Sequence, residues 1–219
     1  MSDNSSGRDV SEMRVSYELG ELDTSSVAPD PLAQFGSWFD EALAAKLLEP
    51  YAMTLATVGI DGQPSARVVL LRGWDESGFV FFTNYESQKG HEIAYTPRAA
   101  LLFYWASLER QIRIEGTVER LPAADSDTYF AKRPRGHRLS AWASKQSTVV
   151  PDRETIDAQM RAYDAQFGDG EVGRPPYWGG YRVVANRFEF WQGRRNRVHD
   201  RILYRRLPER AWKIERLSP

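Results

Sequence analysis

The chain contains no cysteine in its 219 residues. This absence excludes disulfide bonds, thiolate metal sites and cysteine nucleophiles, and it fits a reducing cytoplasm. The three histidines, His91, His137 and His199, have no metal-ligand spacing. We therefore predict neither a metal centre nor an enzyme that uses a thiol.

Long apolar runs and a strong net charge are missing as well. No apolar stretch approaches the roughly 18 residues that a membrane span requires, and the first thirty residues have no apolar core of the signal-peptide type. The formal net charge is -1, whereas proteins that bind nucleic acids are usually basic overall. We expect a soluble cytoplasmic protein that binds neither nucleic acid nor membrane.

The glycine-rich fingerprint of dinucleotide-binding proteins is also absent, because no such motif opens a helix after a strand. The chain has instead a series of short apolar runs separated by turn residues, and Asp61-Gly62 between two of them is a strong hairpin signal. Strands are predicted at residues 53–58, 65–71, 79–83, 99–105, 111–118, 180–184, 187–191, 201–206 and 211–216.

Few helices are predicted. The first begins at Asp30-Pro31, because aspartate can cap a helix and proline suits its first turn. Its apolar residues at helical spacing are Leu32, Phe35, Phe39, Leu43 and Leu47. Further helices are predicted at 123–132 and 153–167. Antiparallel meanders with a few peripheral helices favour a closed or partly closed barrel over a doubly wound sheet.

The domain organisation follows from composition. Residues 1–28 are rich in Ser, Asp, Glu and Gly and contain few large apolar side chains. Burial of so few apolar groups does not offset the entropy lost on ordering, so we expect this segment to be mobile. Residues 29–219 can enclose one sizeable core, and we assign them to a single domain.

The most informative motif is C-terminal. It consists of FEFWQG at Phe188–Gly193, RVHDR at Arg197–Arg201 and WKIERLSP at Trp212–Pro219. Arginine offers a planar fork to a phosphate group, and tryptophan offers a face for stacking. This combination favours binding of a flat conjugated ring that carries a phosphate.

Three other segments offer cations to an anion. Arg67 and Arg72 lie five apart on a predicted strand, so they should face opposite sides and could serve two anions. Lys89 lies where a strand end leads into a helix start, a place that favours phosphate. Tyr129 and Arg133 lie four apart on a predicted helix and can converge on one phosphate. Taken alone, each segment is also compatible with exposed strand ends, a capped turn or a surface pair.

In order and spacing these motifs resemble those of the pyridoxine (pyridoxamine) 5′-phosphate oxidases, and the resemblance runs from about residue 14 to the last residue. It implies a split β-barrel, mainly antiparallel with peripheral helices, that acts as a homodimer with FMN in the interface. It also implies a reaction of vitamin B6 metabolism, oxidation of pyridoxine 5′-phosphate or pyridoxamine 5′-phosphate to pyridoxal 5′-phosphate. Hydride would pass from C4′ of the substrate to N5 of FMN, with oxygen as the final acceptor and hydrogen peroxide as its product.

The resemblance also implies roles for individual residues. FMN is expected to contact Arg67, Val68, Val69, Leu70, Leu71, Arg72, Phe82, Thr83, Gln88, Lys89, Gln111, Gln146, Ser147, Trp191 and Arg201. The substrate is expected to contact Arg14, Tyr17, Arg72, Tyr129, Arg133, His137, Arg197 and His199. Arg197 and His199 lie over the substrate ring and are the candidate catalytic residues, and the segment from Arg14 to Tyr17 is a candidate substrate lid.

The chain departs from the family pattern at three positions. Arg72 replaces the usual lysine, His137 the usual serine, and Gln88 the usual arginine. These departures leave open a related FMN-dependent oxidase of another substrate, such as a phenazine precursor. A non-catalytic protein that binds flavin or pyridoxal phosphate is the third alternative.

Overall fold

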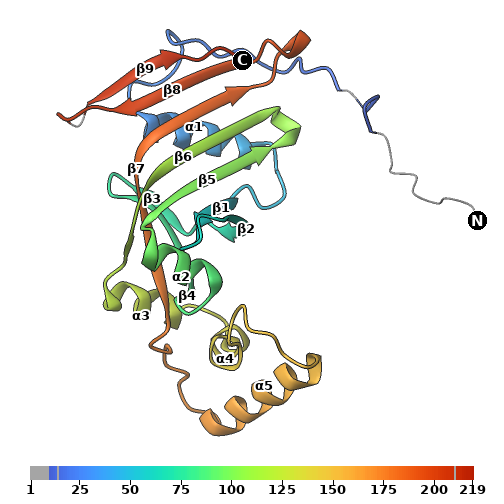
Figure 1. The fold of residues 1–219 in the computed structure, drawn as a ribbon, viewed down its shortest axis with the longest axis vertical. Coiled ribbons are helices and arrows are strands. Elements are labelled where there is room, and N and C mark those ends of the chain that lie inside the picture. Colours follow the sequence, from blue (N-terminus) through green and yellow to red (C-terminus); the bar gives the residue numbers. More distant parts are fainter. Residues whose placement is uncertain (1–9, 14, 210) are drawn as a thin grey trace, which may run out of the picture.

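The computed structural model describes residues 10–13, 15–209 and 211–219 of the chain (Figure 1). Within these residues nine strands form one sheet, in which all pairings are antiparallel. They are β1 (Ala52–Val58), β2 (Pro64–Leu70), β3 (Gly73–Asp75), β4 (Gly78–Asn84), β5 (Arg98–Trp105), β6 (Arg110–Arg120), β7 (Trp178–Gln192), β8 (Asp200–Arg206) and β9 (Trp212–Arg216). Their order is β2-β1-β5-β6-β7-β4-β3, with β8 paired to β7 and β9 paired to β8. The predicted antiparallel architecture is confirmed.

Strand β7 runs through 15 residues and organises this sheet. One of its edges pairs with β6, and the other pairs with β4 over residues 178–183 and with β8 over residues 187–192. Asn186 lies between these two stretches as a bulge, opposite the register shift between Glu115 and Gly116. The prediction of two strands here, 180–184 and 187–191, is therefore wrong, because a bulge bends a strand without ending its pairing.

The helices lie around the sheet (Figure 1). They are α1 (Pro31–Ala44), α2 (Gln88–Tyr95), α3 (Ala123–Ala131), α4 (Arg135–Ala143) and α5 (Arg153–Phe167), with 3-10 turns η1 (Ala106–Leu108) and η2 (Arg195–Arg197). The predicted cap is confirmed, since the Asp30 carboxylate accepts hydrogen bonds from the backbone N–H groups of Leu32 and Ala33. The sequence did not predict α4. No helix in the described ranges has the length and apolarity needed to cross a membrane.

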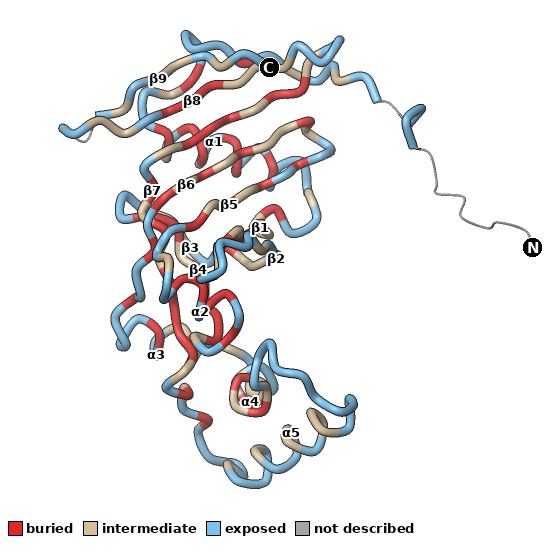
Figure 2. Tube along the Cα trace, in the orientation of Figure 1, coloured by how far each residue is buried: buried red, intermediate tan, exposed pale blue. Residues whose placement is uncertain are grey.

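Helix α1 covers the core of the sheet. Phe35 is fully buried, and its ring lies 5.0 Å from that of Phe79 on β4 and 5.2 Å from that of Phe103 on β5. The buried face of the helix consists of Pro31, Gln34, Phe35, Trp38, Phe39 and Ala42 (Figure 2). The predicted stripe is therefore wrong at its C-terminal end, because Leu43 points to solvent at 51% exposure and the helix stops before Leu47.

Residues 17–28 of the N-terminal segment pack on the domain, whereas residues 10–13, 15 and 16 are exposed. Leu22 and Val27 are buried in the core, the N–H of Leu22 donates to Asp200 (3.0 Å), and the Tyr204 hydroxyl donates to the carbonyl of Ala28 (2.7 Å). The low apolar content of residues 1–28 did not predict this packing. Two buried apolar side chains and a few hydrogen bonds to the backbone of the segment are enough to hold it on the domain. A lid movement of this segment stays a prediction.

The aromatic packing of α1 yields a stability prediction. We expect Phe35→Ala to lower the free energy of unfolding by about 3–5 kcal/mol, because it leaves a cavity among buried rings. Leu43→Ala on the same helix should change it by less than about 0.5 kcal/mol, since its side chain is largely solvated. Urea-induced unfolding followed by tryptophan fluorescence measures both. Equal effects of the two substitutions would contradict this assignment of the buried face.

Candidate functional site

A cavity of about 1120 Å³ is formed by β2, the junction of β4 and α2, and the segment from α3 through residue 147. The predicted site residues that line it are Arg67, Val68, Val69, Leu70, Arg72, Phe82, Thr83, Gln88, Lys89, Tyr129, Arg133, His137, Gln146 and Ser147. The fold thus brings together most of the positions expected to bind FMN and the substrate phosphate. Leu71 is an exception, because its side chain is buried in the core.

Two predictions about side-chain direction are corrected. Arg67 and Arg72 line the same cavity, because β2 ends at Leu70 and the alternation of side chains along a strand does not extend to Arg72. Tyr129 and Arg133 do not share a helix, because α3 ends at Ala131 and the N–H of Arg133 closes a turn onto the carbonyl of Phe130. They still converge on the same cavity.

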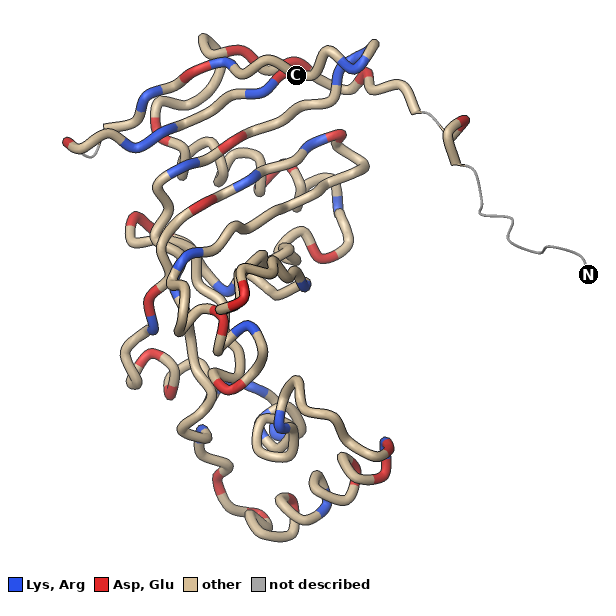
Figure 3. The backbone as a smooth tube through the Cα atoms, in the orientation of Figure 1, with Lys and Arg blue, Asp and Glu red and all other residues tan. Residues whose placement is uncertain are grey.

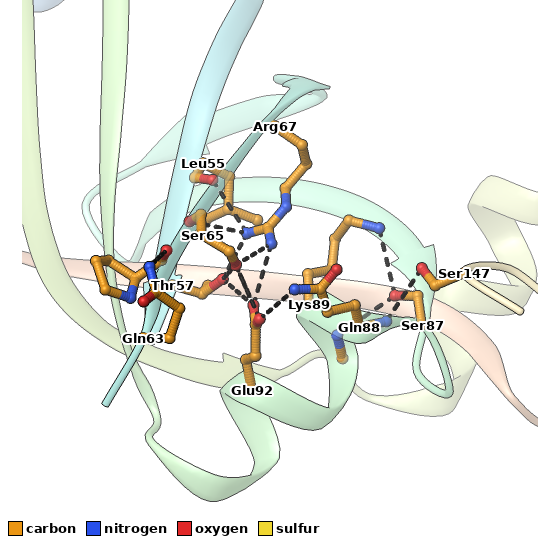
Figure 4. A network of polar contacts seen from close by, with 12 residues as sticks. Leu55, Thr57, Gln63, Ser65, Arg67, Ser87, Gln88, Lys89, Glu92 and Ser147 are labelled. Carbon is orange, nitrogen blue, oxygen red and sulfur yellow. Dashed lines mark hydrogen bonds and ion pairs between the residues drawn. The ribbon is translucent and has the colours of Figure 1, made fainter. Parts of the chain in front are cut away.

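One end of the cavity is organised around Arg67 and Glu92 (Figure 4). Arg67 Nη2 lies 3.1 Å from Glu92 Oε2, and its Nη1 donates to the Leu55 carbonyl (3.2 Å) and to Thr57 Oγ1 (2.5 Å). Burial alone would raise the pKa of Glu92. Hydrogen bonds from Thr57, Ser65 and Gln88, together with the charge of Arg67, outweigh this effect and lower the pKa to about 2. Glu92 is therefore a charged carboxylate that supports Arg67 without itself lining the cavity.

Lys89 lies at the same end, in the first turn of α2. Ser87 caps this helix through a hydrogen bond from the N–H of Gly90 (3.3 Å). Only glycine fits at position 90, because a Cβ there would lie 2.0 Å from the carbonyl oxygen of Tyr85. Lys89 Nζ donates to Gln146 Oε1 (3.0 Å), and burial, followed by the charge of Arg67, lowers its pKa.

The loop after α4 closes this end. The N–H of Gln88 donates to Ser147 Oγ (3.2 Å), and the Thr83 hydroxyl donates to Gln146 (3.3 Å). Gln146 and Ser147 are thus held against α2 although more than fifty residues separate them in sequence. A buried ammonium, a guanidinium and several hydroxyl and amide groups form a donor set that fits a phosphate.

The other end of the cavity contains Tyr129, Arg133 and Trp178. The Tyr129 ring stacks on Phe82 with centroids 3.8 Å apart, and the Arg133 guanidinium lies 4.5 Å from the Trp178 ring centroid. Burial lowers the pKa of Arg133; Tyr129 opposes this effect, and the charge of Arg72 adds to it. Arg133 Nη1 is buried and has no hydrogen-bond partner within the described chain. Since an unpaired buried donor is costly, this end fits a bound anion.

The site residues predicted in the C-terminal motif lie away from the cavity, and Gln111 lies beside them. Gln111, Trp191 and Arg201 are direct partners across β6, β7 and β8, so they form one row on one face of the sheet. None of them lines the cavity, and neither do Arg197 and His199. Lys and Arg are interspersed with Asp and Glu along these strands (Figure 3), as in the contact of Arg201 Nε with Glu189, at 2.8 Å.

The geometry of His199 is well defined. Its ring lies 4.6 Å from that of Trp191, and its Nδ1 accepts a hydrogen bond from the N–H of Arg194 (3.1 Å). An accepting Nδ1 places the proton of the neutral imidazole on Nε2. Burial, and then the charge of Arg197, lowers the pKa of His199. Asn196 and Arg197 both have left-handed backbone conformations, with φ of 58° and 61°, which are uncommon for non-glycine residues and often mark functional sites.

Tyr17 completes this C-terminal cluster, whereas Arg14 lies outside the described residues. The Tyr17 ring lies 5.7 Å from those of Trp191 and His199. Gly193 permits this approach, because a Cβ there would lie 2.8 Å from the Tyr17 ring. The Glu109 carboxylate anchors the segment by accepting the N–H groups of the next two residues, at 2.8 and 2.9 Å.

Sequence reasoning missed Glu92 and Glu109. The spacing of Gln88 and Glu92, four apart on a helix whose start was predicted, was a usable signal. Glu109 gave none, because its partners lie about ninety residues away in sequence. In the described ranges no three His, Asp or Glu side chains are grouped as a metal site.

Comparisons with known proteins agree with this geometry. Residues 39–167 match the family described as pyridoxamine 5′-phosphate oxidase, and residues 178–219 match the pyridoxine 5′-phosphate oxidase C-terminal dimerisation region. The chain is 58% identical over 212 residues to a pyridoxine/pyridoxamine 5′-phosphate oxidase of Burkholderia cenocepacia, a match that covers 96% of this chain and 99% of the relative. The oxidase of the same name from Cupriavidus pinatubonensis is 59% identical over 210 residues, with the same coverage.

Solved structures are similar over nearly the whole chain. PhzG from Burkholderia lata, in complex with tetrahydrophenazine-1-carboxylic acid, superposes with a TM-score of 0.86 at 31% identity, covering 94% of this chain and 100% of PhzG. A pyridoxamine 5′-phosphate oxidase-related, FMN binding protein from Nostoc punctiforme gives 0.68 at 19% identity, covering 89% and 99%, and this likeness concerns the fold alone. The split-barrel fold expected from the sequence is confirmed. From its sequence matches and its full-length relatives, the chain belongs to the pyridoxamine 5′-phosphate oxidase family.

Proposed function

We propose that this protein is an FMN-dependent oxidase that converts pyridoxine 5′-phosphate and pyridoxamine 5′-phosphate to pyridoxal 5′-phosphate, a step of vitamin B6 metabolism. The observation that carries the proposal is one cavity lined by two pairs of cations, Arg67 with Lys89 and Arg72 with Arg133. Two phosphorylated rings that stack on each other need such an arrangement. The name of the relatives at 58% identity supports the same substrates.

FMN fits the end at Arg67 and Lys89. Its phosphate would be held by these two cations with Gln146 and Ser147, next to the backbone of β2. When bound, FMN supplies the redox chemistry, by accepting a hydride from the substrate and passing the electrons to oxygen. The task of the protein is to align the two rings and to exclude alternative poses.

The substrate phosphate fits the other end. Arg133 presents a buried, unpaired Nη1 there, and the Tyr129 hydroxyl and the Arg72 guanidinium converge from α3 and from the end of β2. His137 lines the same part of the cavity from α4. These groups would fix the phosphate and thereby set the position of the substrate ring.

The C-terminal cluster of Arg197 and His199 would come from a second copy of the chain. Residues 178–219, which match a dimerisation region, contain both residues together with Trp191 and Arg201. Within one chain they do not line the cavity. In a homodimer, each copy would cover the cavity of its partner with this cluster, so that FMN lies in the interface and Tyr17 closes over the substrate.

In that arrangement His199 acts as a neutral hydrogen-bond donor. The N–H of Arg194 fixes its tautomer, so Nε2–H is the group available to the substrate. Arg197, whose backbone is left-handed, adds a cation. Together they orient the substrate ring and carry no electrons themselves.

A second candidate substrate is a phenazine precursor. The TM-score of 0.86 with PhzG, whose structure contains tetrahydrophenazine-1-carboxylic acid, favours it. The identity to PhzG is 31%, against 58% to the pyridoxine/pyridoxamine 5′-phosphate oxidase. A cavity with cations at both ends also suits a substrate that carries its own phosphate better than one that carries a single carboxylate.

Turnover tests the proposed function. The purified protein should contain non-covalent FMN and oxidise pyridoxamine 5′-phosphate with one hydrogen peroxide formed per oxygen consumed.

Arg197→Ala and His199→Ala should each lower kcat/KM by about tenfold or more and leave FMN content unchanged, because they remove substrate positioning only. Arg153→Ala on the exposed helix α5 is the control and should have no effect. Bound FMN without turnover of either B6 substrate would refute the proposal, and turnover of a phenazine precursor alone would favour the second candidate.

The substrate-phosphate end yields a prediction for Arg133. Arg133→Lys keeps the charge but loses the planar fork, so KM for pyridoxamine 5′-phosphate should rise about tenfold with little change in kcat. FMN content should stay at the wild-type level, since the flavin phosphate lies at the other end. Steady-state kinetics and flavin absorbance measure these quantities, with Arg153→Lys on the exposed helix α5 as control. A loss of FMN with an unchanged KM would reverse the assignment of the two ends.

The lowered pKa of His199 gives a pH prediction for the flavin-free protein. Burial disfavours the charged imidazole, so the ring should still be mostly neutral at pH 6.5, the ordinary value of its pKa. NMR titration of the ring protons measures it, and the His199→Gln variant identifies the resonance. A titration midpoint at or above pH 6.5 would contradict the environment described for this ring.

A further inference from the structure

Arg67 lines the cavity, but its guanidinium is engaged by the protein (Figure 4). Nη1 donates to Leu55 and Thr57, and Nη2 donates to Ser65 and to Glu92. The hydrogen bonds of both terminal nitrogens therefore go to groups of β1, β2 and α2. A phosphate that enters the cavity must share Arg67 with these groups.

Glu92 is the charged member of this network. It is buried, and its carboxylate accepts hydrogen bonds from Thr57 (2.5 Å), from Ser65 (2.7 Å) and from Gln88 (2.8 Å). It lies on α2, one turn beyond Lys89. The cluster of Arg67, Lys89 and Glu92 thus carries two positive charges and one negative charge.

We propose that Glu92 is a positioning residue that holds the Arg67 guanidinium inward and weakens the hold of the site on the flavin phosphate. The inference rests on the proposed function in placing FMN at this end of the cavity. A phosphate near neutral pH carries a charge of roughly −1.5 to −2, so a buried carboxylate beside its arginine repels it. Glu92 therefore sets the affinity for FMN through charge, without contacting the flavin ring.

Substitution of Glu92 by glutamine separates the effect of its charge from the effect of its hydrogen bonds. A glutamine has nearly the same shape as glutamate. With its amide oxygen at the position of Glu92 Oε2 it still accepts hydrogen bonds from Thr57 and Arg67, and its NH2 group can donate to the side-chain oxygen of Gln88 once that amide turns over. Glu92→Gln thus keeps Arg67 supported while it removes the repulsion of the phosphate. If charge is the larger effect, the variant binds FMN more tightly than the wild type.

Riboflavin, which has the same ring but no phosphate, makes the test specific. Dissociation constants of FMN and of riboflavin are measured by flavin fluorescence quenching with the full chain freed of flavin. We expect Glu92→Gln to tighten FMN binding by about tenfold and to leave riboflavin binding unchanged. Glu76→Gln, which makes the same change of charge in the exposed turn between β3 and β4, should alter neither constant.

A second variant tests the same charge at Gln88, an exposed member of the network that also lines the cavity. Gln88→Lys places an ammonium at an exposed position that already contacts Glu92, so it should also tighten FMN selectively. If Glu92→Gln does not fold, the measurement on Gln88→Lys can still contradict the proposed role of Glu92. In both variants the gain should shrink as salt is raised from about 0.05 to 0.5 M, because salt screens the phosphate charge.

The outcomes are distinct. Unchanged or weaker FMN binding relative to riboflavin in the folded variants would overturn the role of Glu92. Equal changes for both flavins would show a merely structural role and would overturn it as well. Failure of the wild type to bind FMN would refute the proposed function itself, which is a different result.

Discussion

The continuous pairing of β7 is the constraint on which the rest of the structure depends. Its 15 residues bond to β6 along one edge and to β4 and then β8 along the other. Trp178 at its start lines the cavity, whereas Trp191 near its end contacts His199. At about 3.3 Å per residue the strand spans roughly 45–50 Å. A continuous strand of this length places the two candidate clusters of one chain at its opposite ends, so the proposed catalytic arrangement requires a second copy.

Arg67 and Arg133 line the same cavity, but different interactions support their guanidinium groups. Arg67 is balanced by the carboxylate of Glu92, whereas Arg133 lies against the faces of Trp178 and Phe130 and retains a buried Nη1 without a partner. An aromatic face attracts a cation without accepting its hydrogen bonds in the plane of the guanidinium. The support of Arg133 therefore leaves donors for a ligand, and that of Arg67 uses them.

The parts of the fold that depend on local sequence could be predicted, and those that depend on distant partners could not. Alternating apolar runs and Asp61-Gly62 identified the first hairpin, and Asp30-Pro31 identified the start of α1. Helix α4 was missed because its residues are mostly polar and small, with three basic side chains in nine positions. The docking of residues 17–28 and the role of Glu109 depend on contacts made across more than ninety residues of sequence, which no local pattern encodes.

The difference between local sequence pattern and contacts with distant residues also explains which parts of the candidate site could be predicted. Motif resemblance gave the identities of the residues that line the cavity, since it reports which side chains a family uses. It could not give Glu92, because the importance of this carboxylate lies in its distance to Arg67 on another element. Among the described residues a buried carboxylate pairs with Arg67 and none pairs with Arg133. This difference makes physical sense if the two proposed ligands differ in size. FMN offers a large ring system and a ribityl chain for further contacts, so a weaker hold on its phosphate is tolerable. The proposed substrate is smaller and would depend more on its phosphate, for which Arg133 offers a cation without a carboxylate partner among the described residues.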